Sequence, residues 1–527
     1  MTASAEAAAG SAEKTVTTRE FLGYLAMVLG LFMAVLDIQI VASSIREIQA
    51  GISASIDEIS WVQTSYLIAE VVVIPLTGWL SWVMSTRWLF VAAALGFTIM
   101  SIASAFAWDI NSMIVFRSLQ GAFGGAMIPT VFASIFRIFP KSKQAGATVI
   151  AGLVATTAPT LGPTLGGWIT QSFSWHWLFL INIVPGLFVC VAVAALVNID
   201  RPNLGLLRKI DAPGIILVAI FLGCAEYVLE EGPGEDWFDS GQIAALTAVA
   251  AISGLFFIWR ELQCEHPVVV LRAFRDRNFT IGCVFSFVIG VGLFGSTFVM
   301  PLFLSSVRGF NSLQIGVVMI VTGAFQFLSG PIVGVLEKRI DLRIILTMGL
   351  VMFGTGLVLN GTMTAEAGFA ELFLPQAVRG MAIMFCFLPI TTIALGRLPP
   401  AEVNHASGLY NLMRNLGGAI GIAAVNTVFE ARYDLYYLQI AERVRAGGIA
   451  VTDTMSRLSP RLETQLYDPE RSELAALSVI RGLVEREATV MSYNDIFMLV
   501  GGVFILALLL MPLVRKVGHE ANPGEGH

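Results

Sequence analysis

The sequence predicts an all-α integral membrane protein that crosses the bilayer fourteen times and has both termini in the cytoplasm. Hydrophobic residues make up 56% of the chain and charged residues only 13%, whereas soluble domains contain about 25% charged residues. The apolar residues form long runs of about 20 residues, which is the length that spans roughly 30 Å of hydrocarbon. Each run is expected to be a helix, because an unpaired strand would leave backbone groups without hydrogen-bond partners in lipid.

The apolar runs follow one another along the whole chain. They are expected at residues 21–43, 59–83, 88–107, 111–137, 145–171, 176–198, 211–231, 241–261, 279–306, 312–336, 342–361, 370–397, 403–429 and 493–515. The polar segment before the first run lacks the basic, apolar and small-residue pattern of a cleaved signal peptide. The first run is therefore expected to remain as a membrane helix.

The distribution of basic residues supports this count and orientation. Of the 32 Lys and Arg residues, nineteen fall in segments expected to be cytoplasmic, and the short outer loops contain only Arg46 and Arg308. Cytoplasmic loops of membrane proteins are enriched in such residues. A missed or additional helix would reverse the alternation downstream of it, so the pattern favours fourteen crossings.

Two parts of the chain share a pattern of residues that interrupt helices. Arg117 in run 111–137 and Arg379 in run 370–397 are each followed by glycine and then by a proline. Matching Gly- and Pro-interrupted helices in two halves of a chain are typical of transporters. The predicted segments are a cytoplasmic tail (1–20), an N-terminal six-helix bundle (21–198), a two-helix insertion (199–261), the first five helices of a C-terminal bundle (262–429), an extracytoplasmic helical-hairpin loop (430–492), the last transmembrane helix (493–515) and a cytoplasmic tail (516–527).

Several function classes lack support in the sequence. The five cysteines are scattered and none pairs at metal-ligand spacing, so neither a metal site nor a catalytic constellation is expected. No Gly-x-x-x-x-Gly-Lys-Ser/Thr loop is present, which argues against ATP as the energy source. No basic patch interleaved with aromatic residues is present, so we expect no nucleic-acid partner.

Several motifs in the chain are recognisable. They are Leu36-Asp37, Trp61-Val-Gln-Thr-Ser-Tyr66, Arg117-Ser-Leu-Gln120-Gly121, Ala158-Pro159-Thr-Leu-Gly162-Pro163-Thr-Leu-Gly166-Gly167, Trp175-His-Trp-Leu-Phe-Leu-Ile-Asn182 and Gly408-Leu-Tyr-Asn411-Leu-Met-Arg414-Asn-Leu-Gly417-Gly418. On these motifs the chain resembles the major facilitator superfamily, and within it the fourteen-helix drug:proton antiporters of the EmrB/QacA type, nearest to the EmrB branch. The resemblance extends from about Phe21 to Lys516.

The sequence departs from the family pattern after Gly78. Trp82 and Val83 occupy the places of the usual Asp-Arg pair, and only Arg87 of the basic end remains. The family's usual contacts at the cytoplasmic gate are therefore not expected to carry over unchanged.

The resemblance implies a major facilitator fold with a 6+2+6 arrangement of helices in the inner membrane of a bacterium, surrounded by membrane lipid. It implies proton-coupled multidrug efflux of amphipathic small molecules by alternating access, driven by the proton gradient and without a cofactor. EmrB-type pumps work with a periplasmic adaptor and an outer-membrane channel. The 430–492 loop is accordingly interpreted as an adaptor-docking surface or as a solvated hairpin that caps the transporter.

Two other functions remain open on the sequence. The first is dedicated proton-coupled export of one metabolite, lipid or siderophore-like molecule. The second, more remote, is a membrane enzyme or sensor with a transporter-like shell.

Three ionisable residues within the apolar runs are candidates for proton coupling: Asp37, Glu70 and Arg117. A carboxylate in hydrocarbon costs at least about 2.5 kcal/mol, so its presence suggests function. In the family fold Asp37 and Arg117 would face one cavity, where the guanidinium favours the charged carboxylate and its withdrawal favours protonation. The alternative is a static ion pair that fixes helix packing. Glu70 is interpreted as a second proton site, as a counter-charge for a cationic substrate, or as a protonated side chain bonded to a neighbouring helix.

Seven polar residues are candidates for a substrate cavity: Gln63, Tyr66, Gln120, Glu226, Arg379, Asn411 and Arg414. Glu226 is alternatively an acid at the membrane interface that reaches water. Arg379 and Arg414 bind anionic groups of a substrate or, alternatively, bridge backbone carbonyls at Gly-rich crossings.

The run 145–171 contains the residues that resemble the family's antiporter motif. These are Pro159, Gly162, Pro163, Gly166 and Gly167. Glycines at a helix crossing admit close backbone contact, and prolines bend a helix. They would let this helix press against a partner and seal a proton leak, or they serve packing alone.

Overall fold

The computed structural model describes residues 16–55, 58–265, 267–399, 402–446, 453–459, 461 and 468–516, and all regular structure within these ranges is helical. Thirteen helices are long and apolar enough to cross a membrane. A fourteenth crossing is α8 (Lys141–Ser172), which bends by 48° between Pro159 and Leu161. Proline removes a helical hydrogen bond and crowds the preceding turn, which accounts for the bend. The predicted fold class and number of crossings are confirmed.

The first half of the chain forms one group of helices. Its elements are α2 (Thr18–Ser43), α3 (Ile45–Ile52), α4 (Trp61–Val73), η2 (Ile74–Leu76), α5 (Thr77–Met84), α6 (Thr86–Ala105), α7 (Ile110–Ile138), α8, α9 (Trp177–Leu180) and α10 (Ile183–Leu196). The ends are set by capping residues. The Thr17 hydroxyl accepts the backbone N–H of Glu20 at the start of α2, and the Asp109 carboxylate accepts that of Ser112 at the start of α7.

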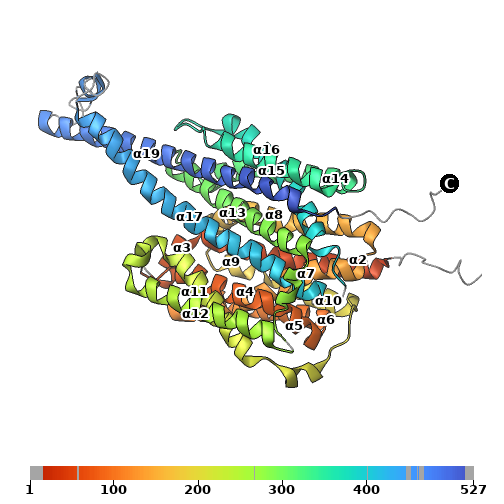
Figure 1. Ribbon diagram of the computed structural model, residues 1–527. Helices are drawn as coiled ribbons and strands as arrows, with labels where there is room; N and C mark the ends of the chain where they lie inside the picture. The colour runs from red at the N-terminus through yellow and green to blue at the C-terminus, as the bar shows by residue number, and fades with distance from the viewer. Residues whose placement is uncertain are drawn as a thin grey trace, which may run out of the picture.

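The rest of the chain forms a pair of helices and then a second group of helices. Its elements are η3 (Leu204–Lys209), α11 (Ala212–Glu231), η4 (Pro233–Glu235), η5 (Trp237–Asp239), α12 (Gly241–Gln263), η6 (Leu271–Arg275), α13 (Arg277–Ser306), α14 (Ser312–Leu336), α15 (Leu342–Asn360), α16 (Phe369–Leu395), α17 (Val403–Arg445), α19 (Pro469–Ala507) and η7 (Leu508–Leu513). Helices α11 and α12 pack on each other, and α11 also packs on α4 and α17 (Figure 1). Helix α11 therefore contacts both groups of helices.

Both groups contain crossings at which two backbones approach closely. An added Cβ on Gly121 of α7 would lie 2.2 Å from the carbonyl oxygen of Tyr66 on α4. An added Cβ on Gly417 of α17 would lie 2.1 Å from the carbonyl oxygen of Phe287 on α13. Small residues permit this approach between helices in lipid, where packing rather than the hydrophobic effect drives association.

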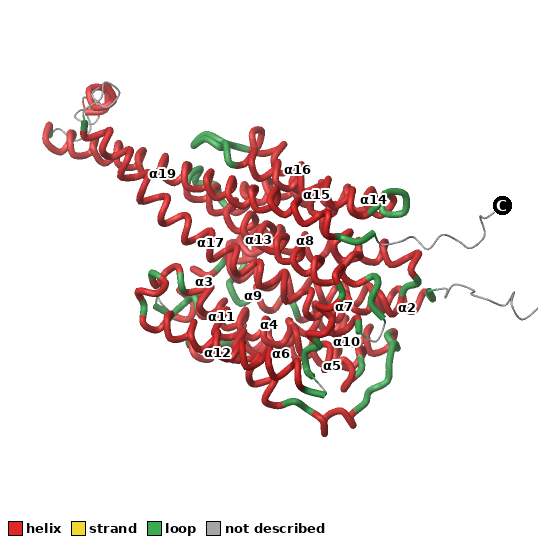
Figure 2. Tube along the Cα trace, viewed as in Figure 1, coloured by secondary structure: helices red, strands yellow, loops and turns green. Residues whose placement is uncertain are grey.

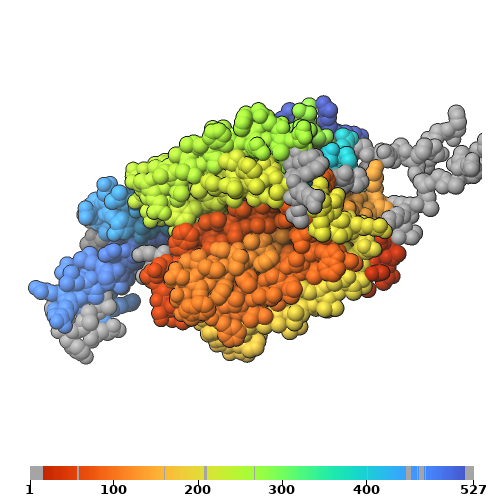
Figure 3. Space-filling model, turned by 90° about the horizontal axis from the view of Figure 1, so that it is seen from below, coloured from red at the N-terminus to blue at the C-terminus, as the bar shows by residue number. Residues whose placement is uncertain are grey.

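The two ends of the bundle are distinguishable. Helix α2 begins and η7 ends at one end, which we call the inner end because the positive-inside pattern assigns it to the cytoplasm (Figure 1). At the opposite, outer end, α17 and α19 continue beyond the other helices as a pair (Figures 2 and 3). Tyr436 of α17 donates to the Asp495 carboxylate at 2.7 Å, and Arg432 forms an ion pair with Asp495 at 3.2 Å, so the pair is bonded together near its base.

The predicted helical-hairpin loop thus has no helix break at its boundaries with the membrane helices. Residues 430–445 belong to α17 and residues 469–492 belong to α19. The backbone hydrogen bonds of a helix are made within the helix itself. A helix can therefore continue from lipid into water, and the change from apolar to polar side chains does not by itself end it. The predicted turn residues Gly447, Gly448 and Pro460 lie outside the described residues.

Candidate functional site

A fully buried ion pair lies between α2 and α7. Nη1 of Arg117 donates to Oδ2 of Asp37 at 2.5 Å, and neither side chain is exposed. The other carboxylate oxygen, Oδ1, accepts hydrogen bonds from Nε2 of Gln120 at 3.1 Å and Nδ2 of Asn182 at 2.8 Å. The carboxylate is therefore bonded through both oxygens, to two residues of α7 and to Asn182 between α9 and α10. This arrangement compensates a charge that would otherwise be costly to bury.

Arg117 has further partners on α4. Its Nε donates to the carbonyl oxygen of Val62 at 3.1 Å, and its guanidinium lies 4.3 Å from the centre of the Tyr66 ring. Nη1 also donates to Oε1 of Gln120 at 2.8 Å. The cation–π contact and the backbone bond hold the guanidinium beside α4. The cluster thereby joins α2, α4 and α7.

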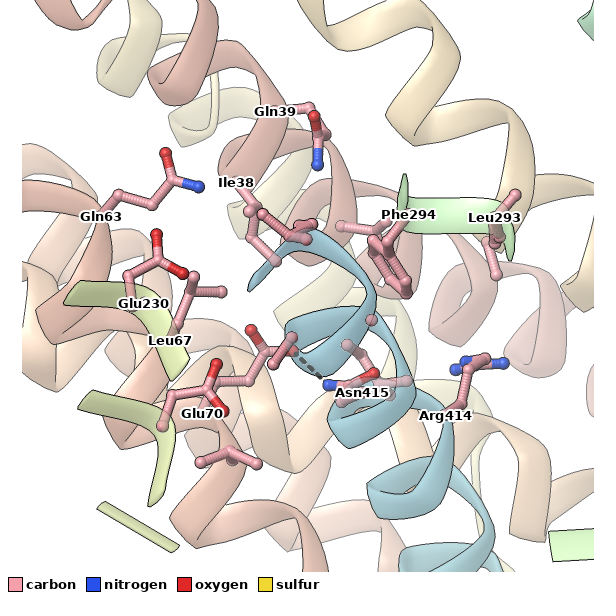
Figure 4. Close-up of a pocket in the computed structure, with 18 of the residues that line it drawn as sticks. Ile38, Gln39, Gln63, Leu67, Glu70, Glu230, Leu293, Phe294, Arg414 and Asn415 are labelled. Carbon is pink, nitrogen blue, oxygen red and sulfur yellow. Dashed lines mark hydrogen bonds between the residues drawn. The ribbon is translucent and has the colours of Figure 1, made fainter. Parts of the chain in front are cut away.

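A cavity lies beside this cluster, between the two groups of helices. It is lined by α2, α4, α7, α8, α11, α13 and α17. Its empty volume is about 860 Å³, which includes the solvent-filled space at its opening. Figure 4 shows Gln63, Glu70 and Glu230 on one side and Leu293 and Phe294 on the other. Most of the lining is apolar, with a few polar groups, as in sites that bind small organic molecules.

One polar contact at the cavity joins the two groups of helices. Nδ2 of Asn415 on α17 donates to Oε1 of Glu70 on α4 at 3.3 Å (Figure 4). Nη2 of the adjacent Arg414 donates to Oδ1 of Asn411 at 2.5 Å. The Arg414 guanidinium also lies between two aromatic rings, 5.4 Å from each ring centre. Arg414 is thus fixed by α17 itself and by aromatic contacts, and the described contacts include no carboxylate bonded to it.

The charge of the cavity is predominantly acidic. Glu226 and Glu230, one helical turn apart on α11, line it together with Glu70. Arg414 is the one basic side chain among the described lining residues. Oε2 of Glu226 is buried and has no hydrogen-bond partner among the described residues. Three carboxyl groups around one cavity favour positively charged ligands over anions.

The cavity is closed at its inner end by contacts between the two groups. Nδ2 of Asn404 donates to Oγ of Ser81 at 2.8 Å, and the Trp82 ring meets the His405 ring edge-on at 4.6 Å. Oγ of Ser407 donates to the carbonyl oxygen of Pro129 at 2.9 Å. Since α17 runs outward from Asn404, the cavity residues of α17 lie on the outer side of this closure.

A different set of contacts occupies the loop where the sequence lacks the family's Asp-Arg pair. Asp200 accepts hydrogen bonds from the backbone N–H and the hydroxyl of Thr86, both at 2.9 Å. Arg137 forms an ion pair with the same carboxylate at 2.8 Å. The turn between α5 and α6 is therefore held by residues from α7 and from the segment after α10.

Helix α2 connects the ion pair to the cavity. Asp37 belongs to the ion pair, whereas the next two residues, Ile38 and Gln39, line the cavity. Helix α4 does the same, because Tyr66 contacts Arg117 while Leu67 lines the cavity. The ion pair and the cavity therefore contact different faces of α2 and α4.

The glycines of α8 lie directly against α2. An added Cβ on Gly162 would lie 2.3 Å from Cβ of Gln39, and one on Gly166 would lie 2.8 Å from the carbonyl oxygen of Ile40. Gly167 is buried, and Pro159 and Pro163 flank the bend of α8. Any side chain at Gly162 or Gly166 would push α8 away from the helix that contains Asp37.

The candidate cavity residues divide into two sets. Three of the seven, Gln63, Glu226 and Arg414, line the cavity, together with the proton-coupling candidate Glu70. The other four lie elsewhere: Tyr66 and Gln120 in the Arg117 cluster, Asn411 behind Arg414, and Arg379 among α13, α14 and α16. Glu226 is 5% exposed and borders the cavity, so it is not an interfacial acid at the lipid surface.

Arg379 has neutral partners. Its Nη1 donates to the carbonyl oxygen of Ser296 at 3.3 Å, and its Nη2 donates to the hydroxyl of Thr322 at 3.2 Å. That hydroxyl in turn donates to Oε1 of Gln376 at 2.7 Å. The described contacts of Arg379 thus bridge helices in the second group and include no cavity residue.

Three polar side chains of the site are not among the residues predicted from the sequence. Asn182 binds Asp37, Asn415 binds Glu70, and Glu230 lines the cavity. A signal for Glu230 was present, because it follows Glu226 by four residues and therefore shares its helix face. Asn182 and Asn415 both belong to motifs quoted above, but the sequence does not show which partner each one meets.

Comparisons with known proteins give a consistent result. The profile of the Major Facilitator Superfamily matches residues 27–422. The chain is 38% identical over 493 residues to the "Colistin resistance protein EmrB" of Acinetobacter baumannii, covering 93% of this chain and 96% of that protein. It is 30% identical over 504 residues to the "Multidrug export protein EmrB" of Escherichia coli K12, covering 95% and 96%.

A solved structure shows the same fold. The proton:xylose symporter XylE, bound to 6-bromo-6-deoxy-D-glucose, superposes with a TM-score of 0.59 at 13% sequence identity. The match covers 95% of this chain and 97% of that chain. At this identity the likeness concerns the arrangement of helices alone.

Proposed function

We propose that this chain, which belongs to the major facilitator superfamily, is a proton-coupled exporter of amphipathic small molecules. As a member of that superfamily it is a transporter, and it is a multi-pass protein of the bacterial inner membrane. The family needs no cofactor, and in this proposal the energy comes from the proton gradient. Each proton that crosses supplies about 2.3 kcal/mol per 100 mV of membrane potential.

The observation on which the proposal rests is the position of the buried Asp37–Arg117 pair beside an acidic cavity that is closed at its inner end. A buried pair is stable only while both partners stay together, because separating them leaves an uncompensated charge. A proton taken up by Asp37 removes its charge and so weakens its bond to Arg117, and loss of that proton restores the pair. The pair would then couple protonation to the position of α2 and α7.

Alternating access gives this coupling a direction. In the inner-closed arrangement, protons from the outside reach the cavity acids and, through movement of α2 and α4, Asp37. Protonation weakens the bond to Arg117 and favours the inner-open arrangement. There the proton is released to the cytoplasm, and the freed carboxylates accept a substrate that is carried outward when the inner end closes again.

The cavity lining supports a positively charged amphipathic substrate. Glu70, Glu226 and Glu230 provide the counter-charge, and the neighbouring apolar side chains of α2, α4 and α13 provide a non-specific surface. The names of the two bacterial relatives refer to colistin resistance and multidrug export. We extend this substrate breadth to the present chain.

We also propose that the outer extension of α17 and α19 docks a periplasmic adaptor that leads to an outer-membrane channel. The extension stands clear of the bundle (Figure 3), and several of its leucines are exposed. Leu438 is 60% exposed and Leu474 is 67% exposed. Exposed apolar positions on a projecting element support a protein-binding surface.

Transport into inside-out vesicles tests the main proposal. Vesicles acidified inside should accumulate a lipophilic cation, and a protonophore should abolish accumulation. The Asp37→Asn variant should lose gradient-driven uptake. The matched control is Asp109→Asn, which removes a charge outside the membrane but keeps the helix cap, because Asn caps as well as Asp. Uptake that ignores both the gradient and Asp37→Asn would overturn proton coupling.

A further inference from the structure

The two groups of helices meet along a seam between α8 and α14. An added Cβ on Gly330 of α14 would lie 2.9 Å from Val149 of α8, and one on Gly316 would lie 2.4 Å from Thr164. Contact therefore extends from near the inner end of the seam to its outer part. Any ligand in this seam touches both groups of helices at once.

A basic pocket opens at the inner end of the seam. It is lined by Lys143 of α8, Lys338 just after α14, the hydroxyls of Thr18 and Ser142, and the rings of Phe21 and Phe139. An added Cβ on Gly146, which also lines it, would meet no atom within 4 Å. The described lining contains two cations and no carboxylate. The adjacent Glu20 carboxylate accepts the Thr17 hydroxyl at 3.0 Å.

An apolar groove lies farther along the same seam. It is lined by Thr157 and Leu161 of α8 and by Ile320, Gly323, Phe327 and Leu328 of α14. Two of its side chains are largely exposed, with Phe327 at 65% and Leu328 at 60%. Its lining is almost entirely apolar, which suits a hydrocarbon chain and not a polar molecule.

The pocket and the groove lie on the same side of the seam. On α8, residues 143, 146, 150, 157 and 161 recur at three- or four-residue spacing or multiples of it, so they share one helix face. On α14, Lys338 follows Phe327 by eleven residues, which is about three turns. From residue 150 to residue 161 the rise is about 16 Å. That length matches one leaflet of a hydrocarbon core roughly 30 Å thick.

We propose that the seam binds an anionic phospholipid of the inner leaflet. The phosphate lies between Lys143 and Lys338 in the basic pocket, and an acyl chain follows the groove along α8 and α14. Basic residues near the membrane surface attract anionic headgroups, and the groove accounts for a lipid in preference to a soluble anion. This site is separate from the acidic cavity and does not depend on the proposed transport function.

Binding at this seam has a consequence for conformation. Lys143 belongs to the first group of helices and Lys338 to the second. A single headgroup that contacts both lysines favours the arrangement in which they are close, which is the inner-closed one described above. A ligand shifts a conformational equilibrium by its difference in affinity for the two states.

Native mass spectrometry of the full chain in detergent tests the proposal, with phosphatidylglycerol and phosphatidylcholine as the lipid probes. The wild type should bind phosphatidylglycerol at least tenfold more tightly than phosphatidylcholine. The double variant Lys143→Ala, Lys338→Ala should lose about tenfold or more of that affinity. The matched control is Arg339→Ala, which removes a neighbouring exposed cation that does not line the pocket.

A second variant tests the acyl groove without changing charge. Gly323→Leu places a side chain in the groove, where an added Cβ would have only Thr157 near it, at 4.0 Å. It should weaken binding of the lipid severalfold and leave binding of glycerol phosphate unchanged. Equal phosphatidylglycerol affinity in the double lysine variant would overturn the proposal. So would displacement of the lipid by glycerol phosphate at equal concentration, which would identify a soluble-anion site.

Discussion

Gly78 of α5 and His405 of α17 are in direct contact at the inner end of the bundle. An added Cβ on Gly78 would lie 2.7 Å from the Cα atom of His405. Cβ atoms do not approach backbone so closely, so closure of the two groups at this point requires glycine. The position is the one after which the sequence loses the family's Asp-Arg pair, and here a steric fit and the Trp82 ring contact lie in its place.

The first prediction concerns this contact. Gly78→Val should prevent full closure of the inner end, because the added side chain meets the backbone of α17 and not a flexible side chain. Spin labels at Arg87 and Arg397 should show a longer distance distribution than in the otherwise unchanged protein. Gly502→Val in α19, where an added Cβ meets no atom within 4 Å, serves as the control. An unchanged distribution in Gly78→Val would contradict a role for this contact in closure.

The second prediction concerns the Asp37–Arg117 pair. Asp37→Asn leaves Arg117 buried without its counter-charge and should destabilise the protein by about 3–5 kcal/mol. Adding Arg117→Gln should recover much of that stability but none of the gradient-driven transport. Thermal unfolding in detergent and vesicle uptake report the two quantities separately. If the double variant transports normally, the pair has a structural role alone.

The third prediction concerns substrate charge. Glu226→Gln and Glu230→Gln each remove one carboxylate from the cavity and should reduce transport of a lipophilic cation about tenfold relative to a neutral analogue. Glu231→Gln is the matched control, because Glu231 accepts the Thr64 hydroxyl at 3.1 Å and does not line the cavity. Equal losses for the charged and neutral compounds would exclude charge recognition by α11.

The fourth prediction concerns helix crossing. Gly121→Ala should destabilise the protein by about 1–3 kcal/mol, because its Cβ would lie 2.2 Å from the Tyr66 carbonyl oxygen. Gly502→Ala, at an open helical position, should be neutral or stabilising, since Ala favours helix over Gly. The measurement is the midpoint of thermal unfolding of each variant. Similar midpoints for both variants would mean that α4 and α7 separate at little cost.

The fifth prediction concerns the outer extension. Leu438→Ser with Leu474→Ser should reduce drug resistance of whole cells while leaving uptake into vesicles unchanged, because vesicle transport needs no adaptor. A matched pair of substitutions at lipid-facing positions, Leu255→Ser with Leu509→Ser, controls for general loss of surface leucines. Loss of vesicle uptake in the extension variant would instead assign the extension to the transport cycle.

The sequence was sufficient for the fold class and the number of crossings, and it identified both members of the central ion pair as candidates. Fourteen apolar runs and the alternation of basic residues depend on bilayer thickness and on charge, which act on each segment separately. Asp37 and Arg117 were identifiable because an ionisable residue in an apolar run is costly wherever it lies. Their approach to 2.5 Å is a result of the structure. Resemblance to the family supplied the expectation that they face each other.

Other features were not accessible in this way. The sequence alone placed Arg379 and Asn411 with the cavity residues, whereas the structure separates them from it. The spacing of residues along a helix tells which of them share a face. It does not tell which neighbouring helix that face contacts, because the rotation of the helix in the bundle depends on all its partners. The same limit concealed Asn415, whose role depends on Glu70 lying opposite to it at 3.3 Å.

By itself, the sequence determined which segments cross the bilayer, in which orientation, and which charges are buried in them. These properties follow from the transfer energy of each segment between water and lipid. Only the tertiary structure decided that the inner end closes through Gly78 and His405, that α11 supplies two acids to the cavity, and that α17 continues through residue 445 without a break. Such features depend on contacts between residues up to hundreds of positions apart, and local composition does not encode those contacts.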